Sequence, residues 1–176
     1  MTGVQTCALP ILIYNETAVL DFDVNFKLMP PLRTESDRKA LWEGLKDGTI
    51  DCIVSDHRPN DSEETDLEFD HANFGNSTLQ TLFGELGACP EFDLELVVGA
   101  LTGKGRELLS LDTLPVEDQP MADLSLFVPG KPWVFTKEDL LIPCTNTPAL
   151  NKPLNGFVYG IINNGKFALK ETREHV

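Results

Sequence analysis

The sequence has little positive charge. Its 28 acidic residues outnumber its 14 lysines and arginines, which gives a formal net charge of -14. Nucleic acids and anionic membranes attract basic surfaces, so we expect binding to neither. The sequence also lacks any apolar run approaching the roughly 20 residues that span a bilayer. What it does contain, 41% hydrophobic residues in a chain of 176, suffices for one core or for one domain with an appendage in a soluble globular protein.

Cysteine and histidine are scarce and scattered. The cysteines are Cys7, Cys52, Cys89 and Cys144. They show neither the paired spacing of a zinc site nor a dense disulfide framework, so we expect reduced thiols in a cytoplasmic protein. The three histidines form no paired motif either. The sequence by itself therefore shows no group of histidines or cysteines at the spacing of metal ligands.

The most informative stretch covers residues 51–75. It opens with the apolar run Cys52-Ile53-Val54, which predicts a short strand within residues 50–55, buried on both faces as in a parallel sheet. A helical segment precedes this strand, and Asp56 follows it. Helix, buried strand and then a carboxylate is the order of an α/β barrel, where the chemistry lies at the carboxyl ends of the strands. Asp56 is therefore the leading candidate for a catalytic residue.

Clear end signals bound the helix before this strand. Thr34 is a good N-cap and Gly48 a good C-cap, with apolar residues at helical spacing between them. Upstream, residues 26–29 predict a barrel strand that stops at Pro30-Pro31, because proline cannot donate to a ladder. Downstream, residues 58–73 are too polar for a core and predict a solvated active-site loop.

The remainder predicts helices followed by strands. Helical segments are expected over residues 78–86, 93–101 and 106–111. Residues 122–128 alternate and predict a strand that ends at Pro129-Gly130. Asn164-Gly165 lies between the apolar residues 157–162 and 166–169, which predicts a β-hairpin.

Several of these pieces resemble the C-terminal barrel region of dihydroorotases, in the cyclic amidohydrolase group of the amidohydrolase superfamily. The matching pieces are residues 27–33, 43–48, 55–57 and 74–75. Their order and spacing carry the resemblance, which extends less sharply to about Phe167. It implies an α/β fold: the C-terminal part of a (β/α)8 TIM-like barrel over residues 12–112, with a small β-rich appendage domain over residues 113–176.

Residues 1–11 resemble the conceptual translation of a sequencing-library adaptor. Our hypothesis is an artefactual leader fused to a truncated reading frame, and we leave these residues out of the fold predictions. The alternative is a genuine short N-terminal extension.

The resemblance also implies an activity and a site. Dihydroorotases reversibly close carbamoyl aspartate to dihydroorotate, commonly with a pair of zinc ions. Asp56 matches the carboxylate that touches a metal and shuttles the proton, although a turn or helix cap is the simpler interpretation of an isolated aspartate. His57, adjacent on the strand, points to the other side and is expected to hydrogen-bond within the barrel wall or loop.

Two positions depart from the family pattern. Many active dihydroorotases have asparagine where this chain has Met29, and histidine facing the substrate carboxylate where this chain has Asn60. With Gly75, these are the candidate substrate-binding residues. Methionine cannot donate a hydrogen bond and asparagine carries no charge, so substrate binding is expected to be altered. Arg33 can compensate or can form a structural salt bridge.

Two alternatives to a dihydroorotase acting on a small-molecule substrate stay open. One is a non-catalytic homologue that serves as a structural partner of aspartate carbamoyltransferase; a homodimer is also compatible with the sequence. The other is an allantoinase- or hydantoinase-like enzyme acting on another cyclic amide.

Overall fold

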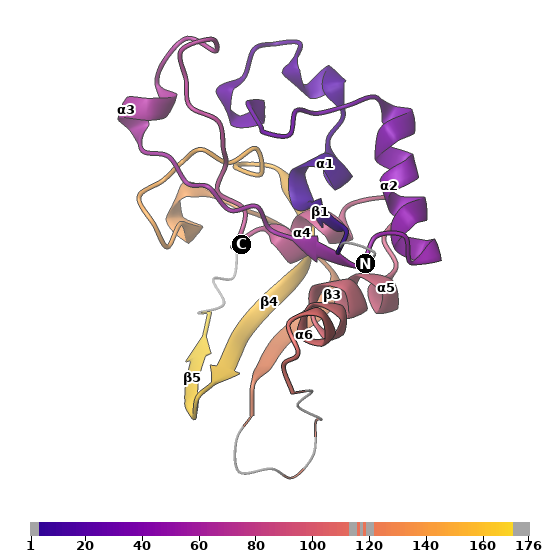
Figure 1. Ribbon diagram of the computed structural model, residues 1–176. Helices are drawn as coiled ribbons and strands as arrows, with labels where there is room; N and C mark the ends of the chain where they lie inside the picture. The colour runs from indigo at the N-terminus through magenta and orange to yellow at the C-terminus, as the bar shows by residue number, and fades with distance from the viewer. Residues whose placement is uncertain (1–3, 113–115, 117, 119–121, 171–176) are drawn as a thin grey trace.

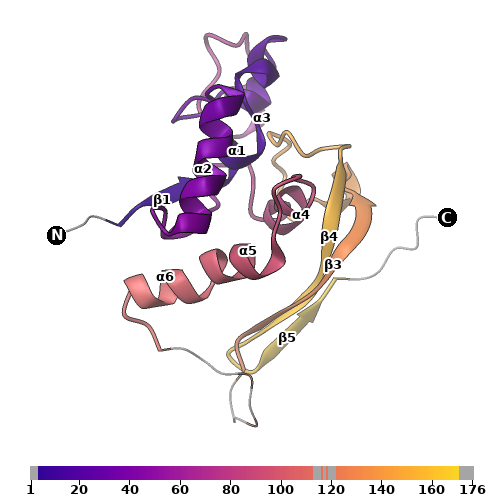
Figure 2. The same ribbon diagram turned by 90° about the vertical axis from the view of Figure 1, so that its right-hand side faces the viewer.

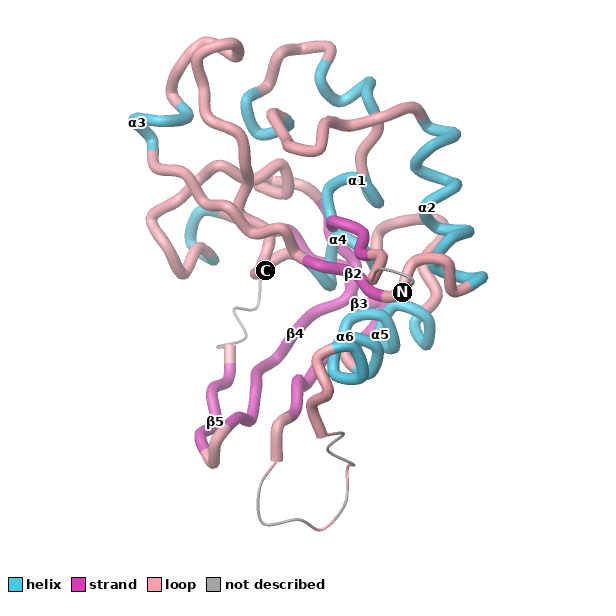
Figure 3. The backbone as a smooth tube through the Cα atoms, viewed as in Figure 1, coloured by secondary structure: helices cyan, strands magenta, loops and turns pink. Residues whose placement is uncertain are grey.

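Two small sheets organise the computed structural model, which describes residues 4–112, 116, 118 and 122–170 (Figure 1). One sheet is the parallel pair of β1 (Thr6–Ala8) and β2 (Cys52–Val54). The other is antiparallel, with the order β3 (Leu124–Val134), β4 (Pro153–Asn163) and β5 (Lys166–Leu169). Loops make up much of the chain between β2 and α4 (Figure 3). The described residues form a mixed α/β arrangement without a closed barrel.

Short helices connect and cover these sheets. They are α1 (Leu9–Ile13), α2 (Glu35–Asp47), α3 (Ser62–Thr65), α4 (Leu82–Gly87), α5 (Leu94–Leu101) and α6 (Gly103–Leu108), with 3-10 turns η1 (Glu16–Val19), η2 (Val24–Phe26) and η3 (Lys137–Asp139). The helix expected over residues 93–101 is confirmed, with Asp93 as its N-cap. The helix expected over residues 78–86 begins only at Leu82, and the turn expected over residues 106–111 lies earlier, in α6.

The N-terminal segment belongs to the core. Strand β1 pairs with β2 in the register Cys7↔Ile53, and Leu9 and Leu12 of the following helix are 0% exposed. They pack in one cluster with Trp42 of α2. Burial of each leucine contributes about 2 kcal/mol. Residues 6–11, which the sequence analysis left out of the fold, are therefore packed in the core, because their apolar side chains fill the space between β2 and α2.

Helix α2 has the predicted ends. Thr34 and Asp37 form a reciprocal capping box, and Gly48 takes the left-handed conformation with φ 79°. Trp42 is 0% exposed, and its indole Nε1 donates to the carbonyl oxygen of Leu12 at 3.0 Å. The capped helix thus holds the N-terminal segment by both packing and a buried hydrogen bond.

Strand β2 is shorter and less buried than expected. Cys52 and Ile53 are buried, but Val54 is 37% exposed. Burial of the strand on both faces is thus confirmed for two residues and wrong for the third, because within the described residues only β1 pairs with β2. The chain leaves the sheet immediately after Val54.

The strand expected over residues 26–29 is not formed. The segment follows the η2 turn. The Lys27 N–H closes that turn by donating to the Val24 carbonyl oxygen at 3.0 Å, and the Lys27 carbonyl oxygen accepts the N–H of Gly75 at 3.0 Å, so no ladder forms. The Lys27 ammonium is buried and donates to the carbonyl oxygens of Asp70 and Ala72 at 2.9 and 2.6 Å. The lysine thereby holds the loop that follows Asp56, a contact that hydrophobic periodicity does not reveal.

The antiparallel sheet extends beyond its prediction. Strand β3 passes Pro129 and Gly130 and runs on to Val134, so its expected end at these residues is wrong. A register shift between Val128 and Pro132 accommodates the two residues as an irregularity, with Gly130 at φ 74°. The β4–β5 hairpin is confirmed, and Asn164 and Gly165 both take positive φ at its turn.

Helix α4 joins the appendage to the rest of the chain. A Cβ atom at Gly87 would lie 2.0 Å from the carbonyl oxygen of Asn155 in β4, and the Asn155 amide donates to the Gly87 carbonyl at 3.0 Å. Figure 2 shows α4 between the N-terminal elements and the long strands β3 and β4. Glycine is required here because the two backbones touch.

A buried carboxyl lies on the inner side of α4. Glu85 is 3% exposed and accepts hydrogen bonds from the hydroxyls of Tyr14, at 2.8 Å, and Thr81. Burial raises the pKa of Glu85 above its ordinary value, although both hydrogen bonds oppose that shift. The group ties the segment after α1 to α4.

The four cysteines are free and buried. Burial raises the pKa of the Cys7 and Cys89 thiols to about 12, so neither is a reactive thiolate near neutral pH. Among the described helices, none has both the length and the apolar character needed to cross a membrane.

Candidate active site

Asp56 lies two residues beyond the end of β2. Its backbone is in the left-handed region, with φ 49°, so the chain turns sharply at this residue. Its side chain is 22% exposed, and Oδ1 lies 3.0 Å from Nε of Arg58. A non-glycine residue held at positive φ costs on the order of 1–3 kcal/mol and is common at functional sites. The carboxylate is thus presented, partly covered, at the carboxyl end of a strand.

Residues 55–58, which follow β2, are hydrogen-bonded to residues 76–78. His57 bridges Asn76, the N–H of Arg58 donates to the Asn76 carbonyl at 2.9 Å, and Thr78 Oγ1 donates to the carbonyl of Ser55 at 2.9 Å. His57 Nδ1 accepts the N–H of Thr78 at 3.0 Å. The expectation that His57 hydrogen-bonds within the barrel wall or loop is confirmed.

Gly75 and Asn60 meet beside this wall. Gly75 has φ 134°, and a Cβ there would lie 2.7 Å from the carbonyl oxygen of Arg58. The Asn60 side-chain amide donates to the Phe74 carbonyl at 3.4 Å. The structure thus gathers Asn60 and Gly75 with Arg58, and it engages the Asn60 side chain in the loop.

Met29 is connected to this group through the nearby Lys27. It lies two residues beyond Lys27, whose carbonyl accepts the Gly75 N–H, and its side chain is 50% exposed. Arg33 is directed elsewhere: its Nε lies 3.9 Å from Asp37 of α2, and its side chain is 73% exposed. Arg33 therefore forms the structural salt bridge and not a contact with the Asp56 region.

Sequence reasoning missed Asn146. This residue is 3% exposed; its Oδ1 accepts the N–H of Asn60 at 3.3 Å, and its Nδ2 donates to the carbonyl of Gly75 at 3.1 Å. It comes from the loop before β4, and its neighbours in the sequence carry no motif. Only the tertiary fold brings it to the site. Asn76 was missed too: it is 1% exposed, and its side-chain amide has no hydrogen-bond partner among the described residues.

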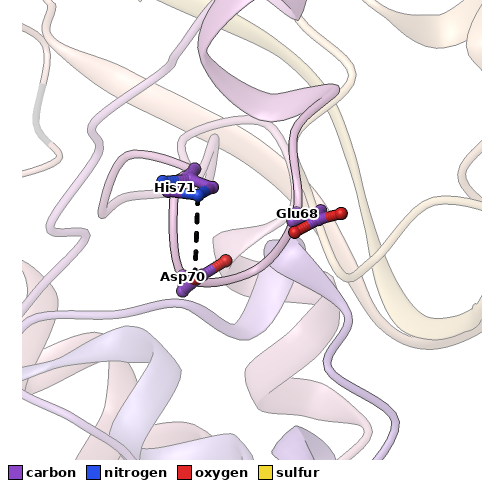
Figure 4. A group of neighbouring side chains, drawn as sticks. All are labelled: Glu68, Asp70 and His71. Atoms are coloured by element: carbon purple, nitrogen blue, oxygen red, sulfur yellow. Dashed lines mark ion pairs between the residues drawn. The ribbon is translucent and has the colours of Figure 1, made fainter.

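The described residues do not assemble a zinc site around Asp56. Among them, the only three acidic, histidine or cysteine side chains whose ligand atoms converge are Glu68, Asp70 and His71 (Figure 4). All three are exposed, and the His71 Nε2 to Asp70 Oδ2 distance is 3.8 Å. Asp56 offers one carboxylate ligand, whereas a zinc ion takes three or four protein ligands. Asp56 is therefore suited to be one ligand of a zinc ion, and the described residues around it do not complete the set.

A separate groove of about 530 Å³ lies between α4 and the antiparallel sheet. Its walls are mainly apolar and include Leu79, Trp133 and Phe157. None of the residues predicted for the site lines it. The groove therefore belongs to the packing of the appendage and not to the surroundings of Asp56.

Comparisons with solved structures define the fold. The chain matches an L-hydantoinase (dihydropyrimidinase) from Arthrobacter aurescens with a TM-score of 0.82 and 20% identity, over 97% of this chain and 40% of that one. A D-hydantoinase (dihydropyrimidinase) from Thermus sp. gives 0.79 and 20%, over 96% and 39%. The inactive dihydroorotase-like domain of the Chaetomium thermophilum CAD-like multifunctional protein gives 0.63 and 16%, over 96% and 46%. The chain therefore has the fold of part of these proteins, a TIM-like barrel.

Sequence comparisons show which proteins the chain resembles in sequence. No protein-family model matches the chain. A dihydroorotase of Caldicellulosiruptor saccharolyticus is 35% identical over 160 residues, 89% of this chain and 37% of that protein. A dihydroorotase of Elusimicrobium minutum is 33% identical over 159 residues, 88% and 37%. The chain is therefore homologous to the dihydroorotases, and it spans less than two-fifths of the length of these relatives.

Proposed function

We propose that this chain is part of a dihydroorotase, a metal-dependent cyclic amidohydrolase that reversibly closes carbamoyl aspartate to dihydroorotate. The observation that carries the proposal is Asp56, partly covered and presented at the carboxyl end of β2. In a barrel enzyme that end of the strand is where the chemistry lies. The free, buried cysteines support a cytoplasmic location.

We divide the chain into barrel and appendage. Residues 12–112 contribute β2 and its helices to the barrel, and residues 113–176 contribute the β-rich domain. The separate sheets support this division. Residues 6–11 are packed with the barrel portion through β1 and α1, which favours treating them with it.

Asp56 performs two tasks in this proposal. It would serve as one ligand of a zinc pair, and the other ligands would have to come from residues outside those described. Such metal ions lower the pKa of water and polarise the amide carbonyl. In hydrolysis, the Asp56 carboxylate accepts the proton of the attacking water and passes it to the ring nitrogen as the C–N bond breaks. Closure runs the same transfers in reverse.

Substrate contacts in the proposal fall to Asn60, Gly75 and Met29. The backbone of Gly75 can approach a ligand closely because it has no side chain. Neither Asn60 nor Met29 carries a charge, and the Met29 side chain has no hydrogen-bond donor. In this proposal, therefore, these three residues contribute little of the affinity for the substrate, and other groups contribute most of it.

A non-catalytic homologue is the second candidate. The specific observation in its favour is the engagement of Asn60 in the loop, together with the half-exposed Met29. Such a protein would serve as a structural partner, of aspartate carbamoyltransferase or of a second copy. An allantoinase- or hydantoinase-like enzyme is a third candidate, differing only in the cyclic amide.

One experiment separates the three. The full-length protein is assayed with dihydroorotate, allantoin and hydantoin, and its bound metal is quantified. We expect turnover of dihydroorotate and about two zinc ions per chain, as in a two-metal hydrolase. Preference for allantoin or hydantoin would favour the third candidate. Absence of both turnover and metal would favour the second.

A further inference from the structure

The guanidinium group of Arg58 has N–H donors that are available to bind a ligand. Its side chain is 56% exposed, and its one charged contact is the ion pair of Nε with Asp56 at 3.0 Å. No acceptor among the described residues takes a hydrogen bond from this guanidinium. An arginine presents a planar fork of donors that matches a carboxylate bidentately. The group is therefore equipped to take an anionic ligand.

The backbone of Arg58 is held firmly in place. Its N–H donates to the carbonyl oxygen of Asn76 at 2.9 Å. On another side Gly75 packs so closely that an added Cβ would lie 2.8 Å from the Cβ of Arg58. A side chain that starts from a fixed backbone loses less entropy when it binds a ligand than one on a mobile loop. The arginine is thus both anchored and available.

The cations of the preceding segments, Lys27 and Arg33, make their contacts away from Asp56. Lys27 is buried and donates to two backbone carbonyl oxygens. Arg33 pairs with Asp37 on α2. The net charge of the chain is -14, so an anionic substrate meets general repulsion and needs a local positive group. Arg58 is placed to supply it.

We propose that Arg58 binds the carboxylate of the substrate beside Asp56, an inference that rests on the proposed function. Carbamoyl aspartate and dihydroorotate both carry a carboxylate next to the ring-forming atoms. Arg58 takes over the recognition that the uncharged Asn60 does not provide. Cyclic amides without a carboxylate gain nothing from this contact, so Arg58 makes the site selective for dihydroorotate.

The test uses the full-length protein with Arg58→Met, which keeps the length of the side chain, and Arg58→Lys, which keeps its charge. Arg33→Met is the matched control. For dihydroorotate we expect Arg58→Met to raise KM about tenfold or more, with a smaller change in kcat, and Arg58→Lys to raise it less. Arg33→Met should leave both constants unchanged. Circular dichroism and thermal unfolding establish that each variant is folded.

A second readout does not depend on turnover. Orotate and uracil differ by one carboxylate, and their affinities are measured by calorimetry. We expect the unsubstituted protein to prefer orotate about tenfold or more and Arg58→Met to lose that preference. Retention of the preference in Arg58→Met, or no preference in the unsubstituted protein, overturns the inference. If the unsubstituted protein neither turns over dihydroorotate nor binds it, the proposed function itself fails.

Discussion

Gly75 packs so closely against Arg58 that a Cβ atom at position 75 would lie 2.7 Å from the Arg58 carbonyl oxygen and 2.8 Å from the Arg58 Cβ. The contact joins the end of the loop of residues 58–73 to the segment after β2 that carries Asp56. Because Gly75 also has φ 134°, a conformation that L side chains rarely adopt, both the backbone and the space around it require glycine.

The first prediction concerns Gly75→Ala. We expect a loss of about 1–3 kcal/mol in the free energy of unfolding, because the alanine is strained at this φ and displaces Arg58. Urea unfolding measures it. Gly99→Ala in α5 is the control: nothing lies within 4 Å of its added Cβ, so that variant should gain about 0.5–1 kcal/mol. Equal stability of the two variants would contradict the packing described here.

The N-terminal segment gives a second prediction. Leu9 is 0% exposed, so Leu9→Ala should lower the free energy of unfolding by about 2–5 kcal/mol through lost burial and a cavity. Val4 is 54% exposed, and Val4→Ala should change the free energy of unfolding by less than about 0.5 kcal/mol. If both substitutions were neutral, residues 6–13 would not be part of the core.

Glu85 predicts a dependence of stability on pH. Its folded pKa is raised above the ordinary value of 4.5, so the folded state holds this proton more tightly than the unfolded state. Its stabilising contribution is complete below about pH 4.5 and is lost as the pH rises through the folded pKa, by at most about 1.4 kcal/mol per pH unit.

Glu85→Gln, which cannot ionise, should remove that part of the pH dependence. Urea midpoints of the variant and the unsubstituted chain, compared from pH 4 to 8, should diverge as the pH rises, with the variant relatively more stable at high pH. Parallel curves across this range would mean that Glu85 does not titrate differently in the folded state.

Asn146 yields a fourth prediction. Asn146→Ala leaves the N–H of Asn60 and the carbonyl oxygen of Gly75 without their partner, which should cost about 1–3 kcal/mol of stability. In the full-length protein the same change should also raise KM, since both neighbours are candidate substrate contacts. Thr145→Ala, at the exposed preceding residue, is the matched control and should leave stability and KM unchanged.

Local signals predicted much of this structure. The Thr34 N-cap, the Gly48 C-cap and the Asn164-Gly165 hairpin are each fixed by a few adjacent residues, and each is confirmed. The position of Asp56 just beyond the short strand β2 likewise follows from neighbouring residues.

What the sequence did not reveal depends on contacts between distant residues. Asn146 reaches Gly75 across 71 positions. Residues 26–29 look like a strand but find no partner for a ladder, because the Lys27 carbonyl and ammonium both bond to the loop instead. Residues 1–11 resemble a translated adaptor, yet the apolar side chains of Cys7, Leu9 and Ile11 pack in the core beside β2.

Asp56→Asn in the full-length protein is the most direct test of the account. The amide keeps the size of the side chain but cannot accept a proton, so we predict a loss of kcat for dihydroorotate of about 100-fold or more, with the overall fold retained. Asp66→Asn, at an exposed carboxylate of the neighbouring loop, should leave kcat unchanged. An Asp56→Asn variant with undiminished kcat would contradict the role assigned to Asp56.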